Sequence, residues 1–159
     1  MDDSPEERKI MLYPLEHYTN STEVKPRPHV ANGANCRNGY GVPVIKYWEP
    51  SCAYCGKDLM ESYDNWLDLS VDHVVPICCQ KTWGPECREW IESMANAVPC
   101  CRACNEFLNG FRAPETAPAS ESEFISLRNK ELARKREHAL QRHQQEQAAF
   151  EALRSRLRQ

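Results

Sequence analysis

Four of the nine cysteines in this 159-residue chain form two CxxC pairs, Cys52 with Cys55 and Cys101 with Cys104. The two thiolates of such a pair bind a single metal ion in a tight turn, and two pairs complete a tetrahedral four-sulfur zinc site. Gly56 follows the first pair and gives the turn a permissive backbone. The spacing therefore predicts a structural zinc ion. Because four cysteines leave no open coordination position, we expect this ion to hold the fold together without doing chemistry.

The other cysteines do not specify a second metal site. Cys100 is an alternative to Cys101 at a CxxxC spacing, but Cys101 repeats the spacing of the first pair. A disulfide framework is a weaker explanation, because thiols stay reduced in the cytoplasm, where we expect this chain. We predict that three irregularly spaced cysteines are ordinary buried thiols: Cys78, Cys79 and Cys87.

A second group of polar residues lies between and just after the cysteine pairs: Asp72, His73, Asn96 and Asn105. The run LSVDHVVP predicts a strand that ends at Pro76, followed by a short helix near 85–95 and a return strand from Asn96 toward the second pair. Neighbouring side chains of a regular strand point to opposite faces, so Asp72 and His73 are not expected to meet. Taken singly, an Asp–His pair is typical of a surface ion pair or a turn, and Asn105 of a helix cap.

Taken together, these residues closely resemble the HNH endonuclease family, whose pattern is CxxC, DHxxP, N, and CxxC followed by N or H. The resemblance covers residues 48–112 and implies an α+β fold, a small ββα-metal core held by the four-cysteine zinc site. It also implies that the strand leaves regular pairing at the Asp–His pair, so that both side chains reach one site. The matching segments are Cys52-Ala-Tyr-Cys55, Asp72-His73-Val-Val-Pro76, Asn96 and Cys101-Arg-Ala-Cys104-Asn105.

The resemblance implies an endonuclease that cleaves or nicks DNA by hydrolysing phosphodiester bonds. Asp72 and Asn105 then bind one catalytic Mg²⁺ or Mn²⁺, because oxygen donors suit hard cations. His73 is the general base that takes a proton from the attacking water, and Asn96 fixes the orientation of the imidazole. The residues leave two alternatives open, a non-catalytic zinc module that binds nucleic acid and an RNA-cleaving toxin with the same core.

Contacts with the phosphates of DNA are expected from basic residues around these motifs. Arg102 and Arg112 flank the helix that follows the second cysteine pair, and Lys81 and Arg88 lie between the motifs. For each of the four, a solvated charge is the alternative. Four aromatic residues are predicted to pack in the core instead of stacking on bases: Trp48, Trp66, Trp83 and Trp90.

The segments that flank the core differ in composition from it. Turn-forming residues dominate the N-terminal part, where the apolar run 40–48 is the best candidate for a strand. The last segment lacks glycine and proline and consists of good helix formers, with Ser120 or Ser122 as its cap and Glu123 as the capping-box acid. We expect four parts: an irregular N-terminal arm (1–47), the HNH core (48–112), a linker (113–120) and a long C-terminal helix (121–159).

The sequence is compatible with several roles for the C-terminal helix. Its apolar stripe is thin, and its members are Leu132, Leu140, Phe150, Leu153 and Leu157. A solvated helix packed loosely on the core, a homodimer contact and a contact with nucleic acid are all compatible with such a stripe. The net charge of -3, an acidic N-terminus and the lack of a long apolar run predict a soluble, cytoplasmic protein without a membrane span.

Overall fold

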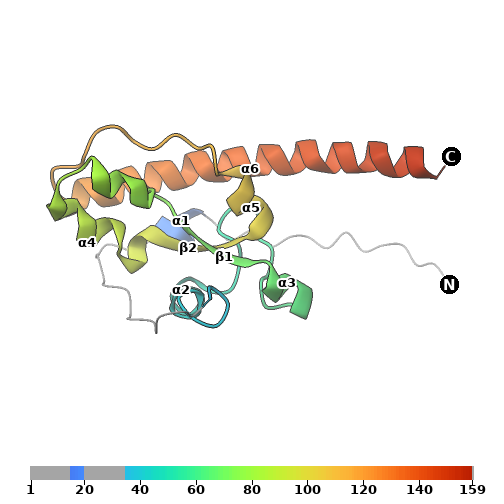
Figure 1. The fold of residues 1–159 in the computed structure, drawn as a ribbon, viewed down its shortest axis with the longest axis horizontal. Helices are drawn as coiled ribbons and strands as arrows, with labels where there is room; N and C mark the ends of the chain where they lie inside the picture. Colours follow the sequence, from blue (N-terminus) through green and yellow to red (C-terminus); the bar gives the residue numbers. More distant parts are fainter. Residues whose placement is uncertain (1–14, 20–34, 159) are drawn as a thin grey trace.

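The fold is a mixture of helices and a small antiparallel sheet, with one long helix running across the rest of the molecule (Figure 1). The computed structural model describes residues 15–19 and 35–158, so most of the predicted N-terminal arm lies outside the described residues. In chain order the elements are α1 (Leu15–Thr19), α2 (Gly41–Trp48), α3 (Tyr63–Leu67), β1 (Leu69–His73), the 3-10 helices η1 (Ile77–Lys81) and η2 (Pro85–Cys87), α4 (Arg88–Ile91), the 3-10 helix η3 (Met94–Asn96), β2 (Ala97–Cys101), α5 (Arg102–Phe107) and α6 (Glu121–Leu157).

In the described part of the chain the sheet has two strands, β1 and β2, and the Asp–His pair lies at one end of it, whereas α5 with Asn105 follows the other end. Asp72 pairs with Val98 and His73 pairs with Ala97, and the amide of Val74 still donates to Asn96 O at 2.9 Å. Regular pairing therefore continues through the Asp–His pair, and the expectation that the strand leaves it there is wrong. All five residues of β2 are buried. The chain passes from β2 directly into α5, and the amide of Arg102 donates to Asp68 O at 2.9 Å. The order strand, strand, helix is therefore present in the region where the sequence predicts it.

The apolar run 40–48 is a helix, so the strand predicted there is wrong. Its branched and aromatic residues favour a strand locally, but Gly41, Val44 and Trp48 are spaced so that one helical face buries all three. Pro43 falls in the first turn, where a missing amide hydrogen costs no helical bond. Trp48 then ties α2 to β2, because its indole nitrogen donates to Ala97 O at 2.7 Å.

The short helices between the strands enclose a second, smaller apolar cluster. The short helix predicted near 85–95 is confirmed as α4, with a 3-10 turn on each side. Cys78 is exposed, so the prediction of a buried thiol is wrong there, whereas Cys79 and Cys87 are buried as predicted. The buried members of this cluster are Val75, Cys79, Trp83, Cys87, Ile91 and Phe124.

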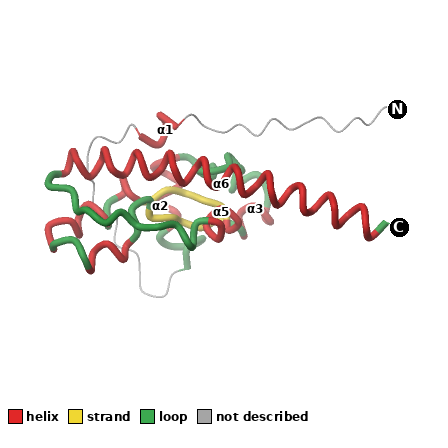
Figure 2. Tube along the Cα trace, turned by 90° about the horizontal axis from the view of Figure 1, so that it is seen from above, coloured by secondary structure: helices red, strands yellow, loops and turns green. Residues whose placement is uncertain are grey.

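Helix α6 begins at the predicted cap, and its buried residues all lie between Phe124 and Ala139. The Ser120 hydroxyl accepts the amide of Glu123 at 3.2 Å, and the Glu123 carboxylate accepts the amide of Ala119 at 2.8 Å. The second half runs past the rest of the described chain (Figures 1 and 2) and leaves Phe150 and Leu157 exposed, so the dimer contact through this end stays a prediction. Within the described ranges, no helix has both the length and the apolar character that crossing a membrane requires.

Candidate functional site

The four cysteines of the two CxxC pairs converge on one point, as their spacing predicts. Their sulfur atoms all lie within 4.8 Å of one another, and Cys55 Sγ is 3.8 Å from Cys101 Sγ. Tetrahedral zinc with Zn–S bonds of about 2.3 Å separates its sulfurs by roughly 3.8 Å. The donor set and its dimensions therefore fit a structural zinc ion.

Local backbone geometry brings the two pairs together. Gly56 has a φ of 78° and its amide donates to Cys52 O at 2.9 Å, which closes the first turn. The amide of Ala53 donates to Pro99 O at 2.9 Å and anchors this turn to β2. At the second pair, the amide of Cys104 donates to Cys101 Sγ at 3.4 Å, so Cys101 caps α5 with its own sulfur.

The four thiols perturb one another strongly. Hydrogen bonds from the Cys104 and Cys52 thiols lower the pKa of Cys101, while burial raises the pKa of Cys52. Four thiolates this close together repel one another, and a divalent metal ion supplies the positive charge that offsets the repulsion. Cys100 lies outside the cluster, and burial raises the pKa of its thiol well above the usual value. The choice of Cys101 over Cys100 is thereby confirmed.

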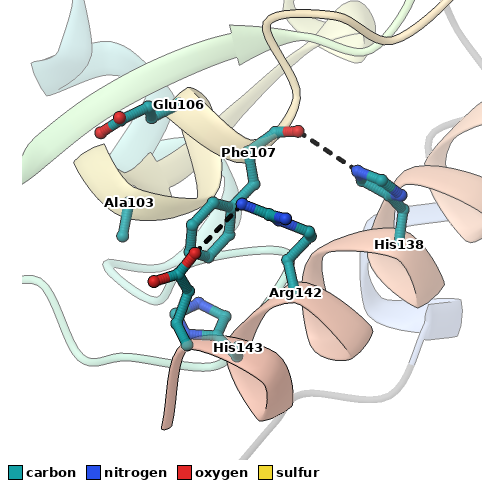
Figure 3. A pocket seen from close by; sticks show the side chains of 7 residues that line it. Ala103, Glu106, Phe107, His138, Arg142 and His143 are labelled. Atoms are coloured by element: carbon teal, nitrogen blue, oxygen red, sulfur yellow. Dashed lines mark hydrogen bonds and ion pairs between the residues drawn. The ribbon is translucent and has the colours of Figure 1, made fainter. Parts of the chain in front are cut away.

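A histidine of α6 adds a contact to this cluster that the sequence did not indicate. His143 Nε2 lies 3.1 Å from Cys104 Sγ, and the Phe107 ring packs edge-on against the imidazole at 5.0 Å. His143 and Phe107 line a cavity between α5 and α6 (Figure 3), and its volume is about 570 Å³. The cavity adjoins the zinc ligands and does not include Asp72 or His73. Its lining residues are Ala103, Glu106, Phe107, His138, Arg142, His143 and Glu146.

Asn96 organises the chain just after the Asp–His pair. Its side-chain oxygen accepts the amide of Val75 at 2.8 Å, and its nitrogen donates to Val75 O at 2.8 Å and to Ile91 O at 2.9 Å. Both amide hydrogens are thereby used, and the side chain is fully buried. Asn96 therefore fixes the backbone that follows His73, which differs from the contact near the imidazole that the resemblance implies.

Asp72 lies in a largely enclosed, polar environment. Its Oδ2 atom accepts hydrogen bonds from the Tyr54 hydroxyl and, at 2.8 Å, from Lys135 Nζ of α6. Burial and the charge of Asp72 raise the pKa of Tyr54 well above its usual value, so the phenol stays protonated and donates. Lys135 also donates to His73 O at 3.1 Å, and the Nε2 atom of His73 is shielded from solvent.

Asn105 lies within α5 and is half-buried. The helix starts at Arg102 with Cys101 as its cap, so the alternative in which Asn105 caps a helix is wrong. The sequence places Asn105 one residue after a zinc ligand, and α5 packs against β1, the strand that carries Asp72. The role of Asn105 as a ligand of a catalytic cation stays a prediction.

The four basic residues proposed for phosphate contacts are all exposed. Arg88 pairs with Glu92 at 3.1 Å, and Arg112 lies 3.9 Å from Glu115. Arg102 donates to Leu67 O at 3.3 Å. Exposed pairs of this kind are weak and leave the cations available for other anions. Lys81, the fourth of these basic residues, is exposed as well.

No family model, no curated protein and no solved structure matches this chain.

Proposed function

We propose that this chain is a metal-dependent endonuclease of the HNH type that hydrolyses phosphodiester bonds in DNA. The observation that carries the proposal is the position of the Asp–His pair. The pair lies at the end of β1, and β1 pairs with β2. The second cysteine pair joins β2 to α5, the helix that bears Asn105. This is the strand–strand–helix order that the resemblance requires, and the four-cysteine cluster joins the loop before β1 to the junction of β2 and α5.

In this proposal the zinc ion has a structural role. Cys52, Cys55, Cys101 and Cys104 provide all four ligands, and none of the four positions is left for water or substrate. The ion joins the loop before β1 to the junction of β2 and α5. It therefore sets the position of α5, and with it Asn105, relative to the strand that carries Asp72.

The hydrolytic chemistry is assigned to the Asp–His pair at the end of β1, to Asn96 beside it and to Asn105 of α5. His73 accepts the proton of the attacking water, since an imidazole titrates near neutral pH. Asn96 holds the backbone after His73 in place through Val75. The Asp72 carboxylate and the Asn105 amide offer the oxygen donors that suit Mg²⁺ or Mn²⁺. When bound, such an ion stabilises the negative charge that develops on the phosphate.

The donor chemistry fits this cation, but Oδ2 of Asp72 already accepts from the Tyr54 hydroxyl and from Lys135. Lys135 already donates to the carboxylate oxygen, so a cation at the same oxygen has to displace the ammonium group. This ion pair favours a second candidate function, a zinc module that binds nucleic acid and does not cleave it. The two candidates differ in one outcome, the cleavage of nucleic acid.

The experiment is a plasmid-nicking assay on zinc-loaded protein, with Mg²⁺, with Mn²⁺ and with EDTA, and with single-stranded RNA as a parallel substrate. We expect nicking of DNA with either cation, and loss of nicking in His73→Ala and in Asn105→Ala. Asn109→Ala, an exposed position just after α5, is the matched control for Asn105→Ala and should cleave normally. Cleavage of RNA alone would redirect the proposal to an RNase, and undiminished cleavage by His73→Ala would exclude the base assignment.

A further inference from the structure

Helix α6 contacts the candidate nuclease site through an ion pair between Lys135 and Asp72, and both charged side chains are largely buried. Lys135 is 3% exposed and Asp72 is 13% exposed, and their charged atoms are 2.8 Å apart. Taking both charges out of water is costly, and an apolar pair of similar size often stabilises a protein as well or better. The ion pair joins residues 63 positions apart in the chain. Local helix stability therefore gives no reason for a lysine at this position of α6.

Lys135 contacts the two residues on which the proposed chemistry depends. Its ammonium group donates to Asp72 Oδ2 and also to His73 O, so it spans the Asp–His pair. It thus places a positive charge against the carboxylate that is proposed to bind the divalent cation. The Tyr54 hydroxyl donates to the same oxygen of Asp72. The carboxylate is therefore compensated without any metal ion.

Helix α6 is fastened to the core on both sides of Lys135. Phe124, Leu132 and Ala139 are fully buried and fasten the first half of the helix to the core. Lys135 lies between the last two of these anchors. In this conformation the Nε2 atom of His73 is shielded from solvent and does not face a bound phosphodiester.

We propose that α6 is an autoinhibitory element of the candidate site: Lys135 occupies the position on Asp72 that the divalent cation requires, and the cation binds only when Lys135 is displaced. The proposal rests on the proposed function, because it concerns regulation of the same site. Docking of Lys135 on Asp72 and binding of the cation are coupled equilibria, so each weakens the other by the same factor. Whatever weakens the docking of Lys135 on Asp72 raises the affinity for the cation, and a bound cation weakens the docking of α6.

The test measures Mn²⁺ binding by electron paramagnetic resonance on the zinc-loaded, full-length chain, so that the cysteine cluster is already filled. Lys135→Met should bind Mn²⁺ at least about tenfold more tightly than the unmodified chain, a coupling of ordinary size. Lys130→Met, an exposed lysine of the same helix, is the matched control and should bind as the unmodified chain does. Adding Asp72→Asn to Lys135→Met should abolish the gain. Equal affinities in Lys135→Met and the unmodified chain would overturn the proposal.

A second variant covers the case in which Lys135→Met fails to fold because Asp72 loses its partner. Phe124→Ala removes a buried anchor of α6 and leaves both charged residues in place. It should tighten Mn²⁺ binding, since a larger share of molecules then has the helix undocked. Phe150→Ala, on the exposed half of the same helix, should not. A Phe124→Ala protein that is folded and shows no gain would contradict the autoinhibitory role.

Plasmid nicking on the same proteins separates the two proposals. If Lys135→Met gains Mn²⁺ affinity through Asp72 but no variant cleaves DNA or RNA, α6 still competes with the cation and the nuclease function is wrong. If the unmodified chain nicks DNA as fast as Lys135→Met, with equal Mn²⁺ affinity, the nuclease function stands and autoinhibition is wrong. If no variant binds Mn²⁺, both proposals are wrong.

Discussion

Replacing Asn96 with alanine should lower the free energy of unfolding by about 3 kcal/mol, because three hydrogen bonds worth about 1 kcal/mol each are lost. Those bonds join the side chain to Val75 N, Val75 O and Ile91 O, at 2.8, 2.8 and 2.9 Å. Asn96 is fully buried, so water does not readily replace the amide. The loss is therefore larger than an exposed asparagine would give.

The assay is urea unfolding of the zinc-loaded protein, followed by tryptophan fluorescence. Asn109→Ala is the control, and a change within about 0.5 kcal/mol is expected at such an exposed position. Hydrogen exchange adds a local readout, since the Val75 amide should exchange faster in Asn96→Ala than in the control. A loss below about 1 kcal/mol, with unchanged exchange at Val75, would refute the reasoning that these bonds fix the chain after His73.

Three further predictions concern the cysteines and their neighbours. Chelation of zinc, or Cys101→Ser, should unfold the core, and circular dichroism together with zinc analysis should show both changes at once; a folded, metal-free protein would contradict this. His143→Ala should weaken zinc binding by about 10-fold or more, as loss of a hydrogen-bonding neighbour of a ligand does, whereas His138→Ala, which removes a contact to a backbone carbonyl, should not. Burial raises the pKa of Cys79 to about 11, so this thiol stays protonated and unreactive at pH 8. The exposed Cys78 should therefore account for the fast phase of thiol labelling in the zinc-loaded protein. Cys78→Ser should remove that phase, and a fast phase that persists would show that another thiol is accessible.

The zinc cluster was predictable because its information is local. Each CxxC pair forms within one turn, and Gly56 has the positive φ that closes the first turn. The return strand and α5 were also predictable, since the second pair ends one and begins the other. The cap at Ser120 follows from the residues next to it.

The contacts of α6 with the core were not predictable from the sequence. The stripe of leucines and phenylalanine suggests a thin, loosely packed face, yet the helix also buries Arg128, Glu131 and Lys135. Two of these residues meet partners far along the chain, Asp72 for Lys135 and Tyr18 O for Arg128, whereas Glu131 pairs with Arg134 of the same helix. Hydrophobic periodicity carries no signal for a buried ion pair.

In the run 40–48, local sequence preference predicts the wrong element. Branched and aromatic residues raise the local preference for a strand, but the packing of Val44 and Trp48 on the core decides for a helix. Preference for one element type is weak compared with the burial of a complete apolar face. The exposed Cys78 is a similar case, because Cys79 beside it occupies the buried position of η1.

The most direct test of the nuclease function compares Lys135→Met with the double variant Lys135→Met/His73→Ala on supercoiled DNA in Mg²⁺. We expect Lys135→Met to nick the plasmid and EDTA to stop the reaction, and we expect the double variant to be inactive with unchanged zinc content and fold. Failure of folded, zinc-loaded Lys135→Met to nick DNA, or equal nicking by the double variant, would contradict it.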